Sequence, residues 1–471
     1  MTPIVPNPSA PLRLALVGHT NTGKTSLVRT LSRDPGFGEV SSRPGTTRHV
    51  EGVRLMVDGI ARVELYDTPG LEDPIELLAR LDGLAAGQRR DGPDRIEQFL
   101  NLPEADGRFE QEAKVLRQMC ASDAALHVID ARDPVLPKHR DELAILALCG
   151  IPLLPVLNFV AGHEADPGAW RRMLAGIGLH AVVEFDAVAP ERDAESVLYR
   201  KLSTLLDAFC EPLERLIAAR QREAEHRRQA ALTEIAALLI DAGAARIPVA
   251  GSADPTSALE ALADAVRRRE HACRQALLEL HRFSEQTVRS PALASLSGRW
   301  QSDLFAPEAL ADMGIRLGTG VAAGAATGVG IDLATGGLTL GAAAALGALA
   351  GGTWQTLRHY GSRLKGRLTG HRELSLDDAI LRLLALRQLH LVRTLEARGH
   401  GAVSAIDIPA AVARPWRQGR LPASLRRARA HPGWSALVAA AGDPSGRSSA
   451  IARLAHSLAE EMSIDPITEV D

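Results

Sequence analysis

Aromatic residues and cysteines are scarce in this chain. Phe, Trp and Tyr together make up 3% of its 471 residues. The four cysteines lie too far apart to suggest a zinc site or a disulfide framework, which is typical of a reducing cytosol: Cys120, Cys149, Cys210 and Cys273. A formal net charge of -3 excludes a global positive field that would attract nucleic acid or lipid. A signal-peptide pattern is also missing, so residues 1–11 are expected to form a flexible tail of a cytoplasmic protein.

Against these absences stands a glycine-rich stretch, GHTNTGKTS at 18–26, which fits the phosphate-binding pattern Gly-x4-Gly-Lys-[Ser/Thr]. An apolar run at 12–17 predicts a buried strand before it, and 26–31 predicts the start of a helix after it. This order aims backbone N–H groups at a phosphate. Gly18 and Gly23 permit the tight turn.

Two side chains of this stretch carry its chemistry. Lys24 supplies a positive charge for the β- and γ-phosphates, and the hydroxyl of Thr25 is a ligand for Mg2+. Lysine occurs at only five positions of the chain, which makes a lysine in the loop harder to explain by chance. The sequence therefore predicts a nucleotide-phosphate site here.

A second motif, DTPG at 67–70, ends the later of two predicted strands, 52–57 and 62–66, which a turn at Asp58-Gly59 joins. An acidic residue at the end of a strand beside a phosphate loop is well placed to hold the Mg2+ shell, which is the role expected of Asp67. The N–H of Gly70 is expected to reach the γ-phosphate.

Together, GHTNTGKTS, PGTTR at 44–48 and DTPG resemble the first three motifs of the Era- and TrmE-like GTPases of the translation-factor class. The resemblance implies a P-loop G domain with a mostly parallel sheet and flanking helices over 12–190. Its partners would be GTP or GDP with Mg2+. It makes Thr47 the switch I residue that closes on Mg2+ and the γ-phosphate, with Thr46 as the alternative, and it puts Gly70 in switch II. Asn21 stands where potassium-responsive members carry Asn, so K+ is a second expected cofactor.

These assignments define a set of site residues. The expected catalytic residues are Lys24, Thr47 and Gly70, and the expected metal ligands are Thr25, Thr47 and Asp67. The expected nucleotide-binding residues are Gly18, Asn21, Thr22, Gly23, Lys24, Thr25, Ser26, Thr46, Thr47, Asp67, Gly70 and Asn158.

Two departures from the family pattern bear on activity and base preference. Leu71 occupies the place of the water-orienting Gln of small signalling GTPases, so another group, a cation or a second protomer would position the water. Glu72, Asp73 and Glu76 are nearby acids. The base motif Asn-Lys-x-Asp keeps its Asn at 158 but reads Asn-Phe-Val-Ala, and the loss of its Asp is expected to weaken the preference for guanine.

Beyond residue 190 the pattern becomes helical, with a helical domain expected at 191–310 and a helical part at 358–471. Between them, 311–357 is rich in glycine at four-residue spacing and carries no charge from 333 to 357. That run is long enough to span roughly 30 Å of hydrocarbon as a helix. The segment is expected to form a glycine-zipper helical hairpin, inserted in the membrane or buried in the helical domain. Arginines at 409–442 indicate contact with anionic lipid or RNA, or a solvated helix face.

The combined pattern resembles a bacterial family that joins an Era-like G domain to a C-terminal domain of unknown function. We expect a GTP-hydrolysing switch at the inner membrane, slow without an activator or self-association of its G domain. The alternatives are a soluble assembly GTPase acting on RNA or ribosomes, although nucleic acid is not the favoured partner, and a degenerate nucleotide-binding module.

Overall fold

The computed structural model describes the following residues: 10–34, 36–38, 49–85, 91–162, 164–250, 256–283, 304–305, 331–335, 338–341, 371–399, 416, 420–437 and 443–463. Thr46 and Thr47 lie outside them, as does most of the predicted hairpin at 311–357.

The chain divides into two compact units. The first contains Met1–Ala224 and Ala397–Ser404, and the second contains Glu225–Glu396 and Ala405–Asp471. Helix α8 (Cys210–Ala244) begins in the first unit and ends in the second. The narrower domain boundaries expected from the sequence stay predictions.

The first unit contains a six-stranded sheet in the order β2-β3-β1-β4-β5-β6, parallel except for β2. Its strands are β1 Leu12–Val17, β2 Glu51–Val57, β3 Ile60–Asp67, β4 Ala124–Asp130, β5 Leu153–Asn158 and β6 Val183–Glu184. Asp58 and Gly59 both have positive φ, 51° and 77°, which a two-residue hairpin turn of type I′ requires. The mostly parallel sheet predicted from the motifs is therefore confirmed.

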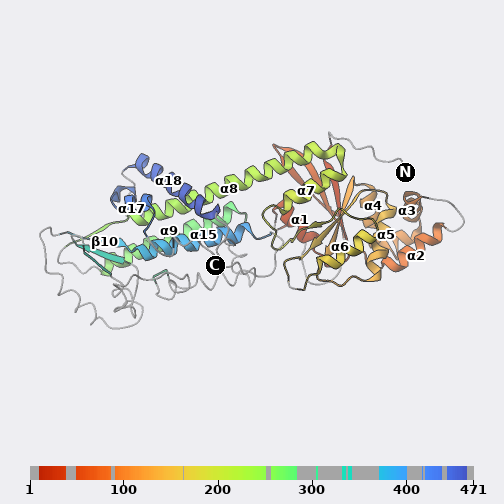
Figure 1. Cartoon of the computed structure of the whole chain (residues 1–471), viewed down its shortest axis with the longest axis horizontal. Helices are drawn as coiled ribbons and strands as arrows, with labels where there is room; N and C mark the ends of the chain where they lie inside the picture. Colours follow the sequence, from red (N-terminus) through yellow and green to blue (C-terminus); the bar gives the residue numbers. More distant parts are fainter. Residues whose placement is uncertain are drawn as a thin grey trace. The chain divides into compact units, whose positions relative to one another are not determined.

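Helices cover both faces of this sheet (Figure 1). They are α1 Lys24–Ser32, α2 Pro74–Ala85, α3 Gly92–Leu100, α4 Glu110–Cys120, α5 Pro137–Leu148, α6 Pro167–Gly176 and α7 Ala194–Leu205, with 3-10 turns at Pro103–Asp106 and Asp207–Phe209. α1, α7 and the start of α8 share one apolar cluster with the strands, and α2 to α5 share another. Because parallel strands are buried on both faces, β4 is apolar almost throughout and buried along its whole length.

The second unit is mainly helical. Its remaining elements are β7 Ile247–Ala250, α9 Thr256–Leu280, β8 Ile331–Thr335, β9 Leu338–Gly341, β10 His371–Leu376, α15 Asp378–Glu396, α17 Ala423–Ala428, a 3-10 turn at Pro432–Trp434 and α18 Pro444–Ser463. Within this unit α8, α9 and α15 lie side by side and contribute to one apolar core (Figure 1). The mostly helical C-terminal region predicted from the sequence is confirmed.

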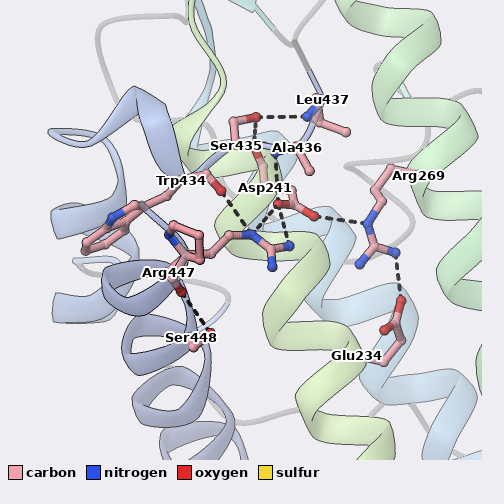
Figure 2. A network of polar contacts seen from close by, with 10 residues as sticks. Glu234, Asp241, Arg269, Trp434, Ser435, Ala436, Leu437, Arg447 and Ser448 are labelled. Carbon is pink, nitrogen blue, oxygen red and sulfur yellow. Dashed lines mark hydrogen bonds and ion pairs between the residues drawn. The ribbon is translucent and has the colours of Figure 1, made fainter. Parts of the chain in front are cut away.

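A buried carboxylate ties several segments of the second unit together (Figure 2). Asp241 on α8 is 1% exposed, and its Oδ1 accepts from Arg447 Nη2 (2.8 Å) on α18 and from the backbone N–H of Ala436 (3.2 Å). Its Oδ2 accepts from Arg269 Nε (3.1 Å) on α9, and Arg269 also contacts Glu234 (2.7 Å). One carboxylate thus holds α8, α9 and the start of α18 in register.

The Gly-rich stretch differs from the helical hairpin predicted for it where the structure describes it. β8 and β9 are antiparallel strands joined by Gly336-Gly337, and β8 also pairs with β10 in a four-stranded sheet. Ile331, Leu333, Leu338 and Leu340 alternate with smaller or polar residues, which is the period of a strand, and each glycine would cost a helix about 1 kcal/mol relative to Ala. Among the helices that the structure describes, none has the length and apolarity to cross a membrane.

Candidate nucleotide site

The predicted phosphate loop connects β1 to α1 in a conformation that demands glycine at two places. Gly18 has φ 143° and Gly23 has φ 88°, and Asn21 between them is also left-handed at 65°. A Cβ at Gly18 would come within 2.4 Å of the Val128 carbonyl oxygen, and one at Gly23 within 2.4 Å of Asn158 Nδ2. Close packing against β4 and β5 therefore shapes the loop before α1 begins at Lys24.

The side chain of Lys24 lies inside this loop. Its Nζ donates to the carbonyl oxygens of Gly18 (2.9 Å) and His19 (2.8 Å), and the residue is 6% exposed. Burial lowers the pKa of Lys24, while the nearby carboxylates of Asp67 and Glu142 oppose that shift. The ammonium group is therefore held at the centre of the loop, where a bound phosphate would exchange for the two carbonyl oxygens.

Thr25 and Asp67 form the second half of the site. Thr25 Oγ1 donates to Asp67 Oδ2 at 2.5 Å, and the other carboxylate oxygen, Oδ1, is buried and has no hydrogen-bond partner. Burial raises the pKa of Asp67 to about 6, so the carboxylate is mostly ionised at neutral pH. An unpartnered buried oxygen next to a hydroxyl, with Lys24 beside them, fits Mg2+, which prefers oxygen ligands and shares them with substrate phosphates.

The segment after β3, which was predicted to be switch II, packs directly on the phosphate loop. A Cβ at Gly70 would lie within 2.5 to 2.8 Å of Thr20, so only glycine permits this approach. The next residue, Leu71, is fully buried with Leu77 and Leu81 in the core beneath α2. A side chain at this position therefore points into the core, away from the place of a water-orienting Gln.

The nearby acids have separate tasks. Asp73 caps α2 by accepting the N–H of Glu76 (3.1 Å), and Glu76 forms an ion pair with Arg108. The side chain of Glu72 is exposed, while its backbone N–H donates to Glu112 (3.2 Å). Among the described residues, Glu72 is thus the one of these three acids whose side chain makes neither a helix cap nor an ion pair.

On the other side of the loop, Asn158 connects the phosphate loop to the loop after β6. Its Nδ2 donates to the Thr22 carbonyl oxygen (2.9 Å), and its Oδ1 accepts the N–H of Ala187 (2.8 Å). Asn158 is fully buried. We call residues 186–189 the base loop, since a base-recognition loop is expected there. The Asn retained from the base motif thus joins the two loops.

The missing parts of the base motif are replaced by a different arrangement. Phe159 stands in place of Lys with φ 58°, and the Arg132 guanidinium lies over its ring at 4.1 Å. Asp186 Oδ2 accepts the N–H of Ala161 (3.1 Å), the position at which the motif would have its Asp. Asp166, five residues after that position, instead caps α6 by accepting the N–H of Ala169 (2.8 Å). A carboxylate is thus present beside residue 161, but it comes from the base loop.

Comparison with known families matches both units. The family described as "50S ribosome-binding GTPase" matches residues 13–159, and "Domain of unknown function (DUF3482)" matches residues 171–456, more than half of the chain. The chain belongs to the DUF3482 family. Its first unit has the P-loop GTPase fold, as the three motifs predicted.

Similar proteins cover only part of this DUF3482-family chain. The tRNA modification GTPase MnmE of Picosynechococcus sp. is 41% identical over 83 residues, 17% of this chain and 18% of the relative. GTPase Der of Azorhizobium caulinodans is 29% identical over 213 residues, 45% of this chain and 38% of the relative. The chain thus spans less than two fifths of the length of either relative. A solved structure of Aquifex aeolicus Era bound to GDP and aluminium fluoride covers 41% of this chain and 56% of that one, with 18% identity and a TM-score of 0.30.

The structure brings most of the predicted site residues together, and their roles stay predictions. The phosphate loop, Asp67, Gly70 and Asn158 surround one position at the ends of β1, β3 and β5, while Thr46 and Thr47 lie outside the described residues. Sequence reasoning missed the contact between Lys138 Nζ on α5 and His19 Nε2 (3.1 Å). His19 Nδ1 lies 2.9 Å from the Leu71 carbonyl oxygen, so the pair of contacts requires the Nδ1–H tautomer. The rarity of lysine was the one signal for Lys138.

Proposed function

We propose that this protein binds GTP and hydrolyses it to GDP and phosphate as a nucleotide-dependent switch. The observation that carries the proposal is the buried, unpartnered Asp67 Oδ1 beside Thr25 and Lys24. A protein interior rarely leaves a carboxylate oxygen unsatisfied unless a ligand completes it. A magnesium-bound triphosphate supplies that ligand.

Each residue of the site has a distinct task in this proposal. The backbone N–H groups at the start of α1 bind phosphate oxygens, and Lys24 exchanges its contacts with the loop carbonyls for the β- and γ-phosphates. Thr25 and Asp67 would hold Mg2+, which neutralises charge on the phosphates when it is bound, with Thr47 as the proposed third ligand. Gly70 donates its N–H to the γ-phosphate, so loss of that phosphate releases switch II.

Hydrolysis is expected to be slow in the isolated protein. Leu71 is buried in the core and cannot orient water, so the positioning group comes from an activator, from a cation or from self-association of the G domain. The degenerate-module alternative predicts binding with no turnover at all. Single-turnover hydrolysis by the full chain, measured with and without raised protein concentration, separates these possibilities.

Nucleotide competition tests the substrate. Labelled GTP is expected to be displaced by unlabelled GTP or GDP at concentrations at least about tenfold below those of ATP, because the Asn158 link and the Asp186 carboxylate keep a polar base site. Equal displacement by ATP would contradict guanine preference while leaving phosphate binding intact.

Potassium is expected to stimulate hydrolysis. Asn21 has a left-handed backbone and lies exposed in the phosphate loop, the place from which a monovalent cation would be bound. Turnover should rise several-fold in KCl relative to NaCl at equal ionic strength, and Asn21→Ala should remove the difference. Equal rates in both salts would refute this role.

The proposed place of action is the inner membrane, because residues 342–357, which follow strand β9, carry no charge. A run of this length suits insertion at the interface rather than a full helical span. Full-length protein should float with vesicles of phosphatidylethanolamine and phosphatidylglycerol, and Leu346→Glu within the run should abolish flotation, because a carboxylate is costly in hydrocarbon. Protein that stays unbound, or flotation unchanged in the variant, would contradict membrane association.

A second candidate, binding to RNA or ribosomes, rests on the exposed side chains of Arg426 and Arg427 on α17. The neighbouring Arg429 is engaged with Asp378 and the Leu376 carbonyl oxygen, which reduces the basic surface that the sequence indicated. Salt-dependent retention on ribosomes, lost in the double variant of Arg426 and Arg427 to Ala, would favour this candidate.

A further inference from the structure

The base loop is held in place from three directions. Asn158 accepts the N–H of Ala187, and Thr30 Oγ1 on α1 donates to the Ala187 carbonyl oxygen (2.9 Å). The third contact comes from far along the chain, where the backbone N–H of Gly399 donates to the Val188 carbonyl oxygen at 2.9 Å. Three contacts therefore fix the backbone of the base loop, the loop that the proposed function places beside the nucleotide base.

The contact at Gly399 leaves no room for a side chain. A Cβ there would lie 2.0 Å from the Ala187 carbonyl oxygen and 2.8 Å from Thr30 Oγ1. Because the closest atom belongs to the backbone of the base loop, any side chain at 399 would displace the loop itself. The preceding residue, Arg398, is also buried, at 3% exposure. Glycine is therefore required at position 399 because a side chain has no room there, and its backbone angles are ones that other residues also adopt.

The segment that contains Gly399 follows directly on a helix of the second unit. The base loop and Gly399 both lie within the DUF3482 match at 171–456, but α15, which ends at Glu396 only three residues before Gly399, belongs to the second unit. Ala397–Ser404 nevertheless belongs to the same compact unit as the base loop. The segment that follows α15 thus packs directly against the base loop.

We propose that Gly399 is a positioning residue for the nucleotide base, and that docking of the segment after α15 is coupled to nucleotide binding. The segment fixes the backbone of the base loop, and with it the Asp186 carboxylate and the Asn158 amide that are bonded to this loop, in one geometry. Linkage is reciprocal, so a bound nucleotide must in turn stabilise the docked segment. The chain that leaves the second unit thereby senses nucleotide through the base, in addition to any movement of the switches. This inference rests on the proposed function.

The test compares Gly399→Ala with Gly176→Ala in the full-length protein. A Cβ at Gly176, at the end of α6, would meet nothing within 4 Å, so this control changes a glycine of the same unit without a clash. Titration with GDP should show at least a tenfold weaker Kd for Gly399→Ala and no change for Gly176→Ala. Inorganic tripolyphosphate with Mg2+, which contacts only the phosphate loop, should bind both variants like the wild type.

Several results would overturn the proposal. An unchanged Kd for GDP in folded Gly399→Ala would do so, and so would an equal loss of tripolyphosphate binding, which would indicate general damage to the domain. Wild-type protein that binds tripolyphosphate but neither GDP nor GTP would contradict the proposed function itself and the inference with it.

A measurement on the wild type decides the matter if Gly399→Ala does not fold. Amide hydrogen exchange in the peptide that contains Gly399 should slow when GDP is added, because the N–H bonded to Val188 becomes more strongly protected. The peptide that contains Gly176 should not change. Equal exchange of the Gly399 peptide with and without saturating GDP would overturn the proposed coupling.

Discussion

Replacing Lys24 with alanine is expected to abolish measurable nucleotide binding and to lower GTP turnover by about a thousandfold. Lys24 is the one ammonium group among the described residues of the phosphate loop, and its Nζ already lies 2.8 to 2.9 Å from two loop carbonyls. Loss of a single preorganised donor to a charge that develops in the transition state costs about 10²–10³ in rate. Loss of ground-state binding adds to that effect. Filter binding measures the loss of nucleotide binding, and phosphate release measures the loss of turnover.

The matched control is Lys201→Ala on α7, which removes a lysine of the same unit from a half-buried position remote from the loop sequence. Lys201→Ala should keep wild-type turnover. The thermal midpoint of Lys24→Ala should stay close to that of the wild type, which would show that the domain still folds. Wild-type turnover in a folded Lys24→Ala protein would refute the assignment of the site.

The second large effect is on stability. Asp241→Ala should lower the free energy of unfolding of the second unit by about 3 kcal/mol, because it leaves Arg269 and Arg447 without their shared carboxylate in a largely buried place (Figure 2). The backbone N–H of Ala436 also loses its acceptor. Urea denaturation followed by circular dichroism measures the shift.

Asp264→Ala provides the comparison for this effect. Its pair with Arg267 lies three residues along α9, and the two side chains are 57% and 41% exposed. Such pairs contribute about 0.5 kcal/mol or less because water screens them. A shift for Asp241→Ala no larger than that for Asp264→Ala would show that the buried network contributes little to the fold.

The local parts of the G domain were predictable from the sequence because their requirements are local. Gly18 and Gly23 recur at a fixed spacing since the loop must turn at positive φ next to β4 and β5, and the strand before it reads as an apolar run. The hairpin at Asp58-Gly59 follows from the same logic. The order of the three motifs also indicated the family, although the altered base motif left the base preference open.

The Gly-rich stretch shows where composition alone misleads. Small residues at four-residue spacing favour close helix packing, but Ile331–Gly341 also alternates with a period of two. The pairing of β8 with β10, about forty residues further on, adds backbone hydrogen bonds that a composition-based prediction does not include. Tertiary pairing therefore decides between the two periods in this part of the chain.

What the sequence by itself determined is the phosphate loop and the helical character of the second unit, because each depends on residues close in the chain or on a repeated spacing. The proximity of Thr25 and Asp67, which are 42 positions apart, followed from the order of the motifs through the family resemblance. Only the tertiary structure decided that Asp186 supplies the carboxylate beside Ala161 and that Gly399 supports the base loop. The residues in these contacts are separated by 25 positions in one case and by more than two hundred in the other. No periodicity or motif encodes such contacts, since they arise only when packing of the apolar core brings distant backbone segments together.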